Sequence, residues 1–154
     1  MRLVVAVVGK ARNPALGDAI RDYEKRAARY WPLDVHEVRE ERAAGMPVDR
    51  VKEREGARLS EKIPARARTV ACEVGGKSLS SQQFADLLQT ARAEDRDLAF
   101  LVGGAFGLDP CVTRSSSMRL SLAPWTLPHE IARLVLVEQI YRAGTIIRGE
   151  PYHK

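Results

Sequence analysis

Residues 98–107 read LAFLVGGAFG, and this stretch decides the fold. Its first five residues form an uninterrupted apolar run, which is typical of a strand that is covered on both faces in a parallel sheet. The glycines at 103, 104 and 107 allow positive φ angles and a close approach of the backbone to a flat ligand. The pattern therefore predicts a central strand that ends in a turn beside a ligand site.

Segments on both sides of this stretch alternate between strand and helix patterns. Further strands are expected at 4–8, 33–38, 69–74 (ended by the glycines at 75 and 76) and 118–122. Helices are expected at 18–30, at 49–63, after a cap at Ser80 or Ser81, after Asp109-Pro110, and at 130–143. Five strands separated by helices predict an α/β fold with an open, largely parallel sheet flanked by helices. We expect one domain that spans residues 1–154.

Composition narrows the class of protein. The chain is 45% hydrophobic and 29% charged, as in soluble globular proteins. The first ten residues contain only a short apolar run, which is too short for a signal peptide or a membrane span, so we expect a cytoplasmic protein without a membrane partner. The two cysteines and three histidines lack the spacing of a metal site, so no metal is expected.

The net charge of +5 favours a polyanionic partner such as a nucleic acid. A plain basic surface is the alternative, because a modest basic excess is common among soluble proteins. The charge alone leaves both open.

Two constrained loops are the candidate walls of a ligand pocket. Ligands of open α/β sheets bind beyond the carboxyl ends of the strands, which points to the loops at 103–108 and 123–129. Pro124 and Pro128 stiffen the second loop and so lower the entropy cost of holding it around a ligand. The alternative is a plain glycine turn and a proline-stiffened connection.

Two nucleotide-binding patterns fit less well. Residues 71–78, ACEVGGKS, resemble a relaxed phosphate loop, yet the first position is Ala71 inside a strand, and the next helix begins after Lys77. The glycines at 103–107 do not have the G-x-G-x-x-G spacing of a dinucleotide site. We therefore keep a phosphate-loop nucleotidase as a weaker alternative and do not expect a nicotinamide enzyme.

The C-terminal segments suggest contacts with a second copy and with RNA. The helix at 131–143 is apolar on nearly every face, which favours burial against a second copy in a homodimer over a wholly internal helix. The tail at 148–154, RGEPYHK, combines an aromatic ring, an imidazole and cations, a mixture that suits single-stranded RNA. A frayed terminus is the alternative.

Four blocks, taken together and in order, resemble a known family. They are VGGAFGL at 102–108, LSL at 120–122 leading into TLPH at 126–129, Arg133 with EQIYRA at 138–143, and the terminal PYHK at 151–154. The whole chain resembles the ribosomal RNA large subunit methyltransferase H family of the SPOUT class. The resemblance implies a SPOUT fold with a deep C-terminal trefoil knot. It also implies transfer of a methyl group from S-adenosylmethionine to N3 of a pseudouridine in 23S rRNA of the assembled ribosome, with S-adenosylhomocysteine as product.

The resemblance also assigns residues to the methyl-donor site. The donor site would use Cys72, Gly103, Gly104, Leu122, Ala123, Pro124, Trp125, Thr126, Leu127 and Pro128. For the target nucleotide we hypothesise, beyond the resemblance, that Arg142, Tyr152 and His153 bind and orient it, that His129 supports the loop, and that His153 or a bound water takes the proton.

This sequence departs from the family pattern in the donor-site loops. Cys72 replaces an aliphatic residue, Phe106 replaces a small or polar residue, and Ala123-Pro124-Trp125 is an unusual version of its loop. An RNA-binding or ribosome-associated factor that has lost catalysis is therefore a second hypothesis.

Overall fold

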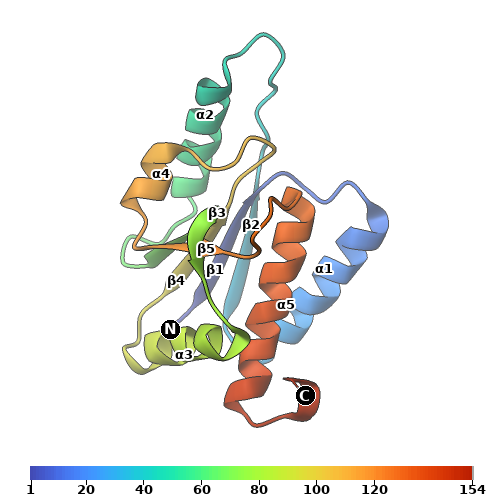
Figure 1. Cartoon of the computed structure of the whole chain (residues 1–154), viewed down its shortest axis with the longest axis vertical. Coiled ribbons are helices and arrows are strands. Elements are labelled where there is room, and N and C mark those ends of the chain that lie inside the picture. The colour runs from blue at the N-terminus through green and yellow to red at the C-terminus, as the bar shows by residue number, and fades with distance from the viewer. Residues whose placement is uncertain (154) are drawn as a thin grey trace.

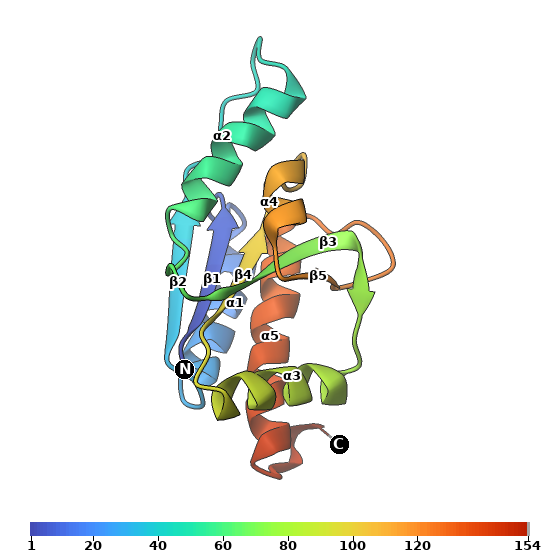
Figure 2. The same ribbon diagram turned by 90° about the vertical axis from the view of Figure 1, so that its left-hand side faces the viewer.

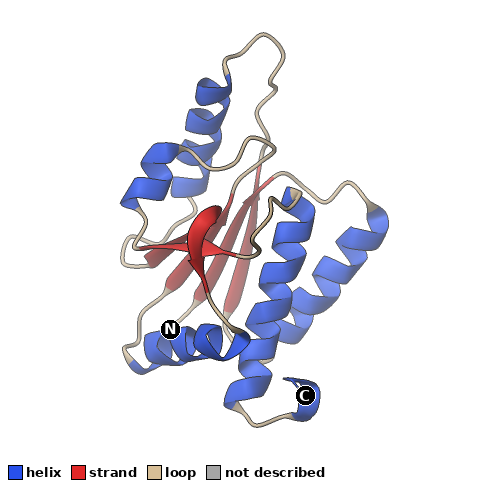
Figure 3. Cartoon of the chain, viewed as in Figure 1, coloured by secondary structure: helices blue, strands red, loops and turns tan. Residues whose placement is uncertain are grey.

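A single parallel sheet organises the chain (Figure 1, Figure 3). The computed structural model describes residues 1–153, in the case of His153 the backbone alone. All strand pairings are parallel, and the strand order is β2-β1-β4-β3-β5. The strands are β1 (Leu3–Val8), β2 (Leu33–Val38), β3 (Arg68–Ser78), β4 (Leu98–Val102) and β5 (Met118–Ser121). The predicted α/β fold with an open, parallel sheet is confirmed, and the apolar run at 98–102 is its central strand.

Helices cover both faces of the sheet. They are α1 (Pro14–Ala27), α2 (Val48–Ser60), α3 (Ser81–Ala93), α4 (Pro110–Ser115), α5 (His129–Ile147) and the short 3₁₀ turn η1 (Pro151–His153). One core cluster joins one face of the sheet to α1, α3 and α5, while a smaller cluster joins the other face to α2 and α4 (Figure 2). β1 and β4 are buried along their whole length because both of their faces are covered.

β3 differs from the sequence expectation. The glycines at 75 and 76 do not end the strand, which continues to Ser78 and bends over the sheet edge (Figure 2). A Cβ atom on Gly76 would lie 2.5 Å from the backbone carbonyl carbon of Leu120, so glycine is needed where β3 passes β5. The pairing with β5 shifts register between Cys72 and Lys77. The residues between them bulge out of the ladder, which increases the local bend.

Two helices begin or end beyond their predicted bounds. Asn13 accepts hydrogen bonds from the backbone N–H groups of residues 15 and 16, so α1 begins at Pro14 rather than at residue 18. α5 runs to Ile147, four residues past the expected end.

Contacts with α1 and β2 hold α5 in place. Arg133 is buried and forms ion pairs with Glu24 at 2.7 Å and with Glu37 at 2.6 Å. Gly144 allows the ring of Tyr30 to pack directly on the helix backbone, where a Cβ atom would meet it at 2.4 Å. None of the helices described in residues 1–153 is both long and apolar enough to cross a membrane. The knot expected from the resemblance stays a prediction.

Candidate active site

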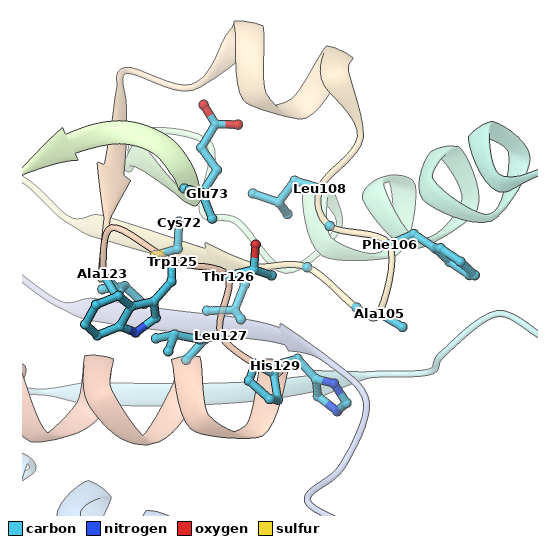
Figure 4. A pocket seen from close by; sticks show the side chains of 18 of the residues that line it. Cys72, Glu73, Ala105, Phe106, Leu108, Ala123, Trp125, Thr126, Leu127 and His129 are labelled. Atoms are coloured by element: carbon cyan, nitrogen blue, oxygen red, sulfur yellow. The ribbon is translucent and has the colours of Figure 1, made fainter.

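A cavity of about 750 Å³ lies beside the bulge of β3 and the carboxyl end of β4, above the start of α5 (Figure 4). One wall is the turn at 103–107 and the other is the loop at 122–128, as expected from the sequence. The lining residues are Lys52, Cys72, Glu73, Val74, residues 102–108, Leu122, Ala123, residues 125–129 and Ala132. The volume is within the range of small-molecule sites.

The turn at 103–107 depends on close backbone packing. Gly107 has a positive φ of 83° and its N–H donates to the carbonyl of Gly104 at 3.0 Å. A Cβ atom on Gly103 would lie 2.5 Å from the carbonyl carbon of Gly107, which leaves no room for a side chain. The expectation of positive φ angles was therefore right for Gly107 and wrong for Gly103 and Gly104, which are needed for close approach.

A buried carboxyl group stands behind this turn. Glu55 on α2 is 4% exposed, and its Oε1 accepts from the backbone N–H of Glu41 at 2.9 Å. Its Oε2 is buried, has no hydrogen-bond partner within residues 1–152, and would lie 2.8 Å from a Cβ atom on Gly104. Burial raises the pKa of this carboxyl above its usual value. Any side chain at position 104 would collide with it.

The facing loop is tied to β5 and carries an aromatic rim. Ser121 donates to the carbonyl of Ala123 at 2.7 Å, which fixes the start of the loop. Trp125 is 68% exposed and Phe106, on the opposite wall, is 42% exposed. Figure 4 shows them on either side of the cavity. Two of the residues that depart from the family pattern, Phe106 and Trp125, are therefore exposed on opposite walls of the cavity. Pro124, which was expected in the donor site, is not among the lining residues.

His129 is the first residue of α5 and lines the cavity. Its Nε2 is buried and has no hydrogen-bond partner among the described residues. A buried polar atom usually has a partner, so this nitrogen is left to pair with a group that the described residues do not supply.

Cys72 lines the same cavity, and burial raises the pKa of its thiol to about 12. The thiol is therefore neutral near pH 7 and unsuited to be a nucleophile.

Arg142 and Tyr152 lie at the other end of α5. Arg142 binds Glu138 through Nε at 2.9 Å and Nη2 at 2.7 Å, and its guanidinium lies 4.8 Å from the Tyr152 ring centre. The Tyr152 hydroxyl donates to Glu138 at 3.1 Å and lies 3.0 Å from that of Tyr23. Hydrogen bonding to Glu138 raises the pKa of Arg142, while burial and the Tyr23 hydroxyl raise the pKa of Tyr152.

These two residues do not meet the cavity within one chain. His129 and Arg142 are 13 positions apart on α5, which corresponds to a rise of about 20 Å. The side chain of His153, and Lys154 as a whole, lie outside the described residues. Of the four residues expected to take part in catalysis, His129 alone lines the cavity in the part of the chain that the structure describes.

Sequence reasoning missed several lining residues. Lys52 reaches the cavity from α2, which reads as a charged surface helix, and Glu73 and Val74 reach it from the bulge in β3. No local sequence pattern marks Glu73 and Val74 as lining residues, because the bend of β3 depends on contacts with β5. Lys77 and Ser78 belong to β3, so the residues of the phosphate-loop alternative do not form a loop before a helix. No group of three His, Cys, Asp or Glu side chains within the described part could hold a metal ion.

Comparison with known proteins identifies the family. A family model described as "Predicted SPOUT methyltransferase" matches residues 1–153. The chain belongs to this SPOUT methyltransferase family. The SPOUT fold expected from the sequence is thereby confirmed.

Curated relatives of this SPOUT methyltransferase extend the match over the full chain. A ribosomal RNA large subunit methyltransferase H from Gemmatimonas aurantiaca is 58% identical over 154 residues, covering 100% of both chains. One from Listeria monocytogenes is 42% identical over 159 residues, again covering 100% of both. These matches confirm the family resemblance that the four sequence blocks suggest.

A solved structure has the same fold at low sequence identity. The crystal structure of a methylase family protein from Neisseria gonorrhoeae superposes with a TM-score of 0.55 at 14% identity, covering 91% of this chain and 81% of that one. At this identity the likeness concerns the fold alone.

Proposed function

We propose that this chain transfers a methyl group from S-adenosylmethionine to N3 of a pseudouridine in 23S rRNA of the assembled ribosome, and releases S-adenosylhomocysteine. The observation that carries the proposal is the convergence of the 103–107 turn and the 122–128 loop on one cavity. It occurs in a chain that is 58% identical, over its full length, to a protein named for methylation of large-subunit ribosomal RNA. Because the proposed substrate is the ribosome, we expect the protein to act in the cytoplasm.

The cavity fits the methyl donor in size and in the groups that it offers. Gly103 and Gly104 line the cavity, so their backbone N–H and C=O groups can contact a flat ring. The unpaired Nε2 of His129 offers one further hydrogen-bonding atom. We infer that Cys72, Leu122, Ala123 and residues 125–128 supply the remaining walls. Pro124 would stiffen the loop from outside the lining.

The protein has to position two reactants and move one proton. S-adenosylmethionine, when bound, supplies a methyl group that its sulfonium already makes electrophilic. The cavity walls exclude water, and Arg142 and Tyr152 orient the target base for an in-line approach. His153 or a bound water accepts the N3 proton, a role that suits an imidazole because its ordinary pKa lies near working pH. No covalent nucleophile is needed, which agrees with the neutral thiol of Cys72.

The separation of the two groups along α5 favours a homodimer. Ala132, the lining residue on α5 that lies nearest to Arg142, is ten positions before it, a rise of about 15 Å, so the tail of one copy would meet the cavity of the other. Ile131, Leu134 and Val135 are only half-buried on α5, although the helix is apolar, and they would pack in such an interface. We also retain the trefoil knot of the C-terminal segment as part of this proposal.

Calorimetry and a methylation assay test the function together. We expect the protein to bind S-adenosylmethionine and to methylate ribosomes that lack the modification, with mass spectrometry locating the methyl group at N3 of one pseudouridine. Binding of ribosomes without measurable donor affinity would instead favour a factor that has lost catalysis. Thermal stabilisation by ATP and not by S-adenosylmethionine would support a nucleotidase.

The tail residues have a direct kinetic test. Tyr152→Phe and His153→Ala should each slow single-turnover methylation. Unchanged rates in both variants would show that their assignment is wrong.

A further inference from the structure

A second hollow lies beside the donor cavity, between the end of α4 and the start of β5. Its volume is about 410 Å³, and it is lined by Thr113, Arg114, Ser116, Ser117, Met118 and Arg119. β5 begins in this hollow and leads directly to Leu122 in the donor cavity. Because β5 has four residues, the two sites are only about 13 Å apart along the strand.

Two arginines give the hollow its positive charge. Arg114 donates to the thiol of Cys111 at 3.3 Å, and none of the ion pairs within the described residues involves it. Arg119 lies 3.3 Å from Glu73, with side chains 59% and 27% exposed respectively. An ion pair as exposed as this contributes little to stability, so an incoming anion can replace the carboxylate.

The remaining polar groups form a fixed frame. Thr113 donates to the carbonyl of Asp109 at 3.2 Å, and Ser116 donates to that of Val112 at 2.8 Å. The N–H of Ser117 donates to the hydroxyl of Thr69 on β3 at 3.2 Å. Since these donors are already used within the protein, the side-chain donors that remain for an anion are the two guanidinium groups and the Ser117 hydroxyl, which makes no hydrogen bond within the described residues.

We propose that this hollow binds a backbone phosphate of the RNA strand that enters the donor cavity. The inference rests on the proposed function, because it takes the polyanion to be the ribosomal RNA. Guanidinium groups match phosphate oxygens with two parallel hydrogen bonds. Glu73 connects the two sites, since it lines the donor cavity and also holds Arg119. A phosphate in the hollow would take Arg119 from Glu73 and fix the strand next to the target nucleotide.

The double variant Arg114→Ala/Arg119→Ala tests the proposal with ribosomes that lack the modification. We expect KM for ribosomes to rise about tenfold, and the slope of log KM against log salt to fall by about one for each arginine. The affinity for S-adenosylmethionine should stay within about twofold of the wild-type value, which shows that the fold is intact. Arg21→Ala is the matched control, because Arg21 on α1 is also exposed and forms one ion pair, with Asp18 at 2.5 Å.

A variant with the opposite expected effect on KM provides a second test. Glu73→Gln frees Arg119 without changing side-chain size, so it should lower KM for ribosomes by about twofold to threefold at low salt. An unchanged KM and salt slope in the double variant would overturn the proposal, as would an effect equal to that of the Arg21 control. Failure of the wild-type protein to methylate ribosomes would instead refute the proposed function itself.

Discussion

The two ends of α5 differ in how their polar groups are satisfied. At the first turn, His129 lines the cavity, and its buried Nε2 has no hydrogen-bond partner among the described residues. At the far end, Arg142, Tyr152 and Glu138 satisfy one another, and Tyr30 donates to Glu150 to hold the tail against the helix. One end leaves polar atoms for a ligand, and the other end is already organised before any ligand is bound.

This difference suggests different roles for the two ends of α5. A site with unpaired groups gains hydrogen bonds when a ligand enters, whereas a paired cluster is held rigidly and can be presented to a partner. Under the proposed function the donor cavity and the tail cluster would have separate tasks, so changes at each end should affect different steps.

The largest effect is expected from Gly103→Ala. The new Cβ atom would lie 2.5 Å from the Gly107 carbonyl carbon, so the turn must open and the cavity wall must move. We expect the affinity for S-adenosylmethionine to fall about a hundredfold, as measured by calorimetry. Gly75→Ala is the control, since nothing lies within 4 Å of a Cβ atom there. Wild-type affinity in Gly103→Ala would contradict the role of the turn.

Arg142→Ala should affect orientation of the target nucleotide rather than binding of the methyl donor. We expect methylation of ribosomes to slow by about thirtyfold, through poorer orientation of the target, with donor affinity changed by less than about twofold. Arg26→Ala is a suitable control, because Arg26 also lies over a tyrosine ring, that of Tyr141, but forms its ion pair with Asp22. Equal losses of donor binding and RNA capture would make Arg142 a structural residue and remove the distinction between the two ends.

The fold and the cavity could be predicted from the sequence only in part. The apolar run at 98–102 predicted the central strand, and the glycine and proline loops predicted both walls of the cavity, because these signals are local. The predicted end of β3 at residue 74 was wrong. Gly76 is needed where the strand passes Leu120, a contact between residues that are distant in sequence. The pairing of Tyr152 with Glu138 and Tyr23 also depends on how α1 and α5 pack, which no local pattern encodes.

His129→Ala should weaken donor binding by a smaller factor. Loss of one hydrogen bond from a buried nitrogen costs about 1 kcal/mol, or about fivefold in affinity for S-adenosylmethionine. His129→Gln, which keeps a polar group of similar reach, should recover part of the loss in the same calorimetric titration. Equal affinities in the wild-type protein and the alanine variant would mean that the nitrogen faces no ligand atom.

The smallest effect is expected at the tail, from Tyr30→Phe. Hydrogen bonding to Glu150 raises the pKa of Tyr30 to about 12. Because the folded-state pKa is raised, this contribution to stability is fully present below pH 10 and is lost as the pH rises from about 10 to 12. Tyr30→Phe should remove this pH dependence from the free energy of unfolding, with a change below about 1 kcal/mol at pH 8. Identical pH profiles for both proteins in urea titrations would argue against the contact.

Subunit mixing tests most directly whether the two ends of α5 from different copies build one site. Gly103→Ala destroys the donor cavity and Arg142→Ala destroys the tail cluster, so neither variant should methylate ribosomes at the wild-type rate alone. After unfolding and refolding an equal mixture, half of the dimers are mixed, and each has one intact pair, so about a quarter of the wild-type activity should return. Activity no greater than the average of the two separate variants would contradict a site shared between copies.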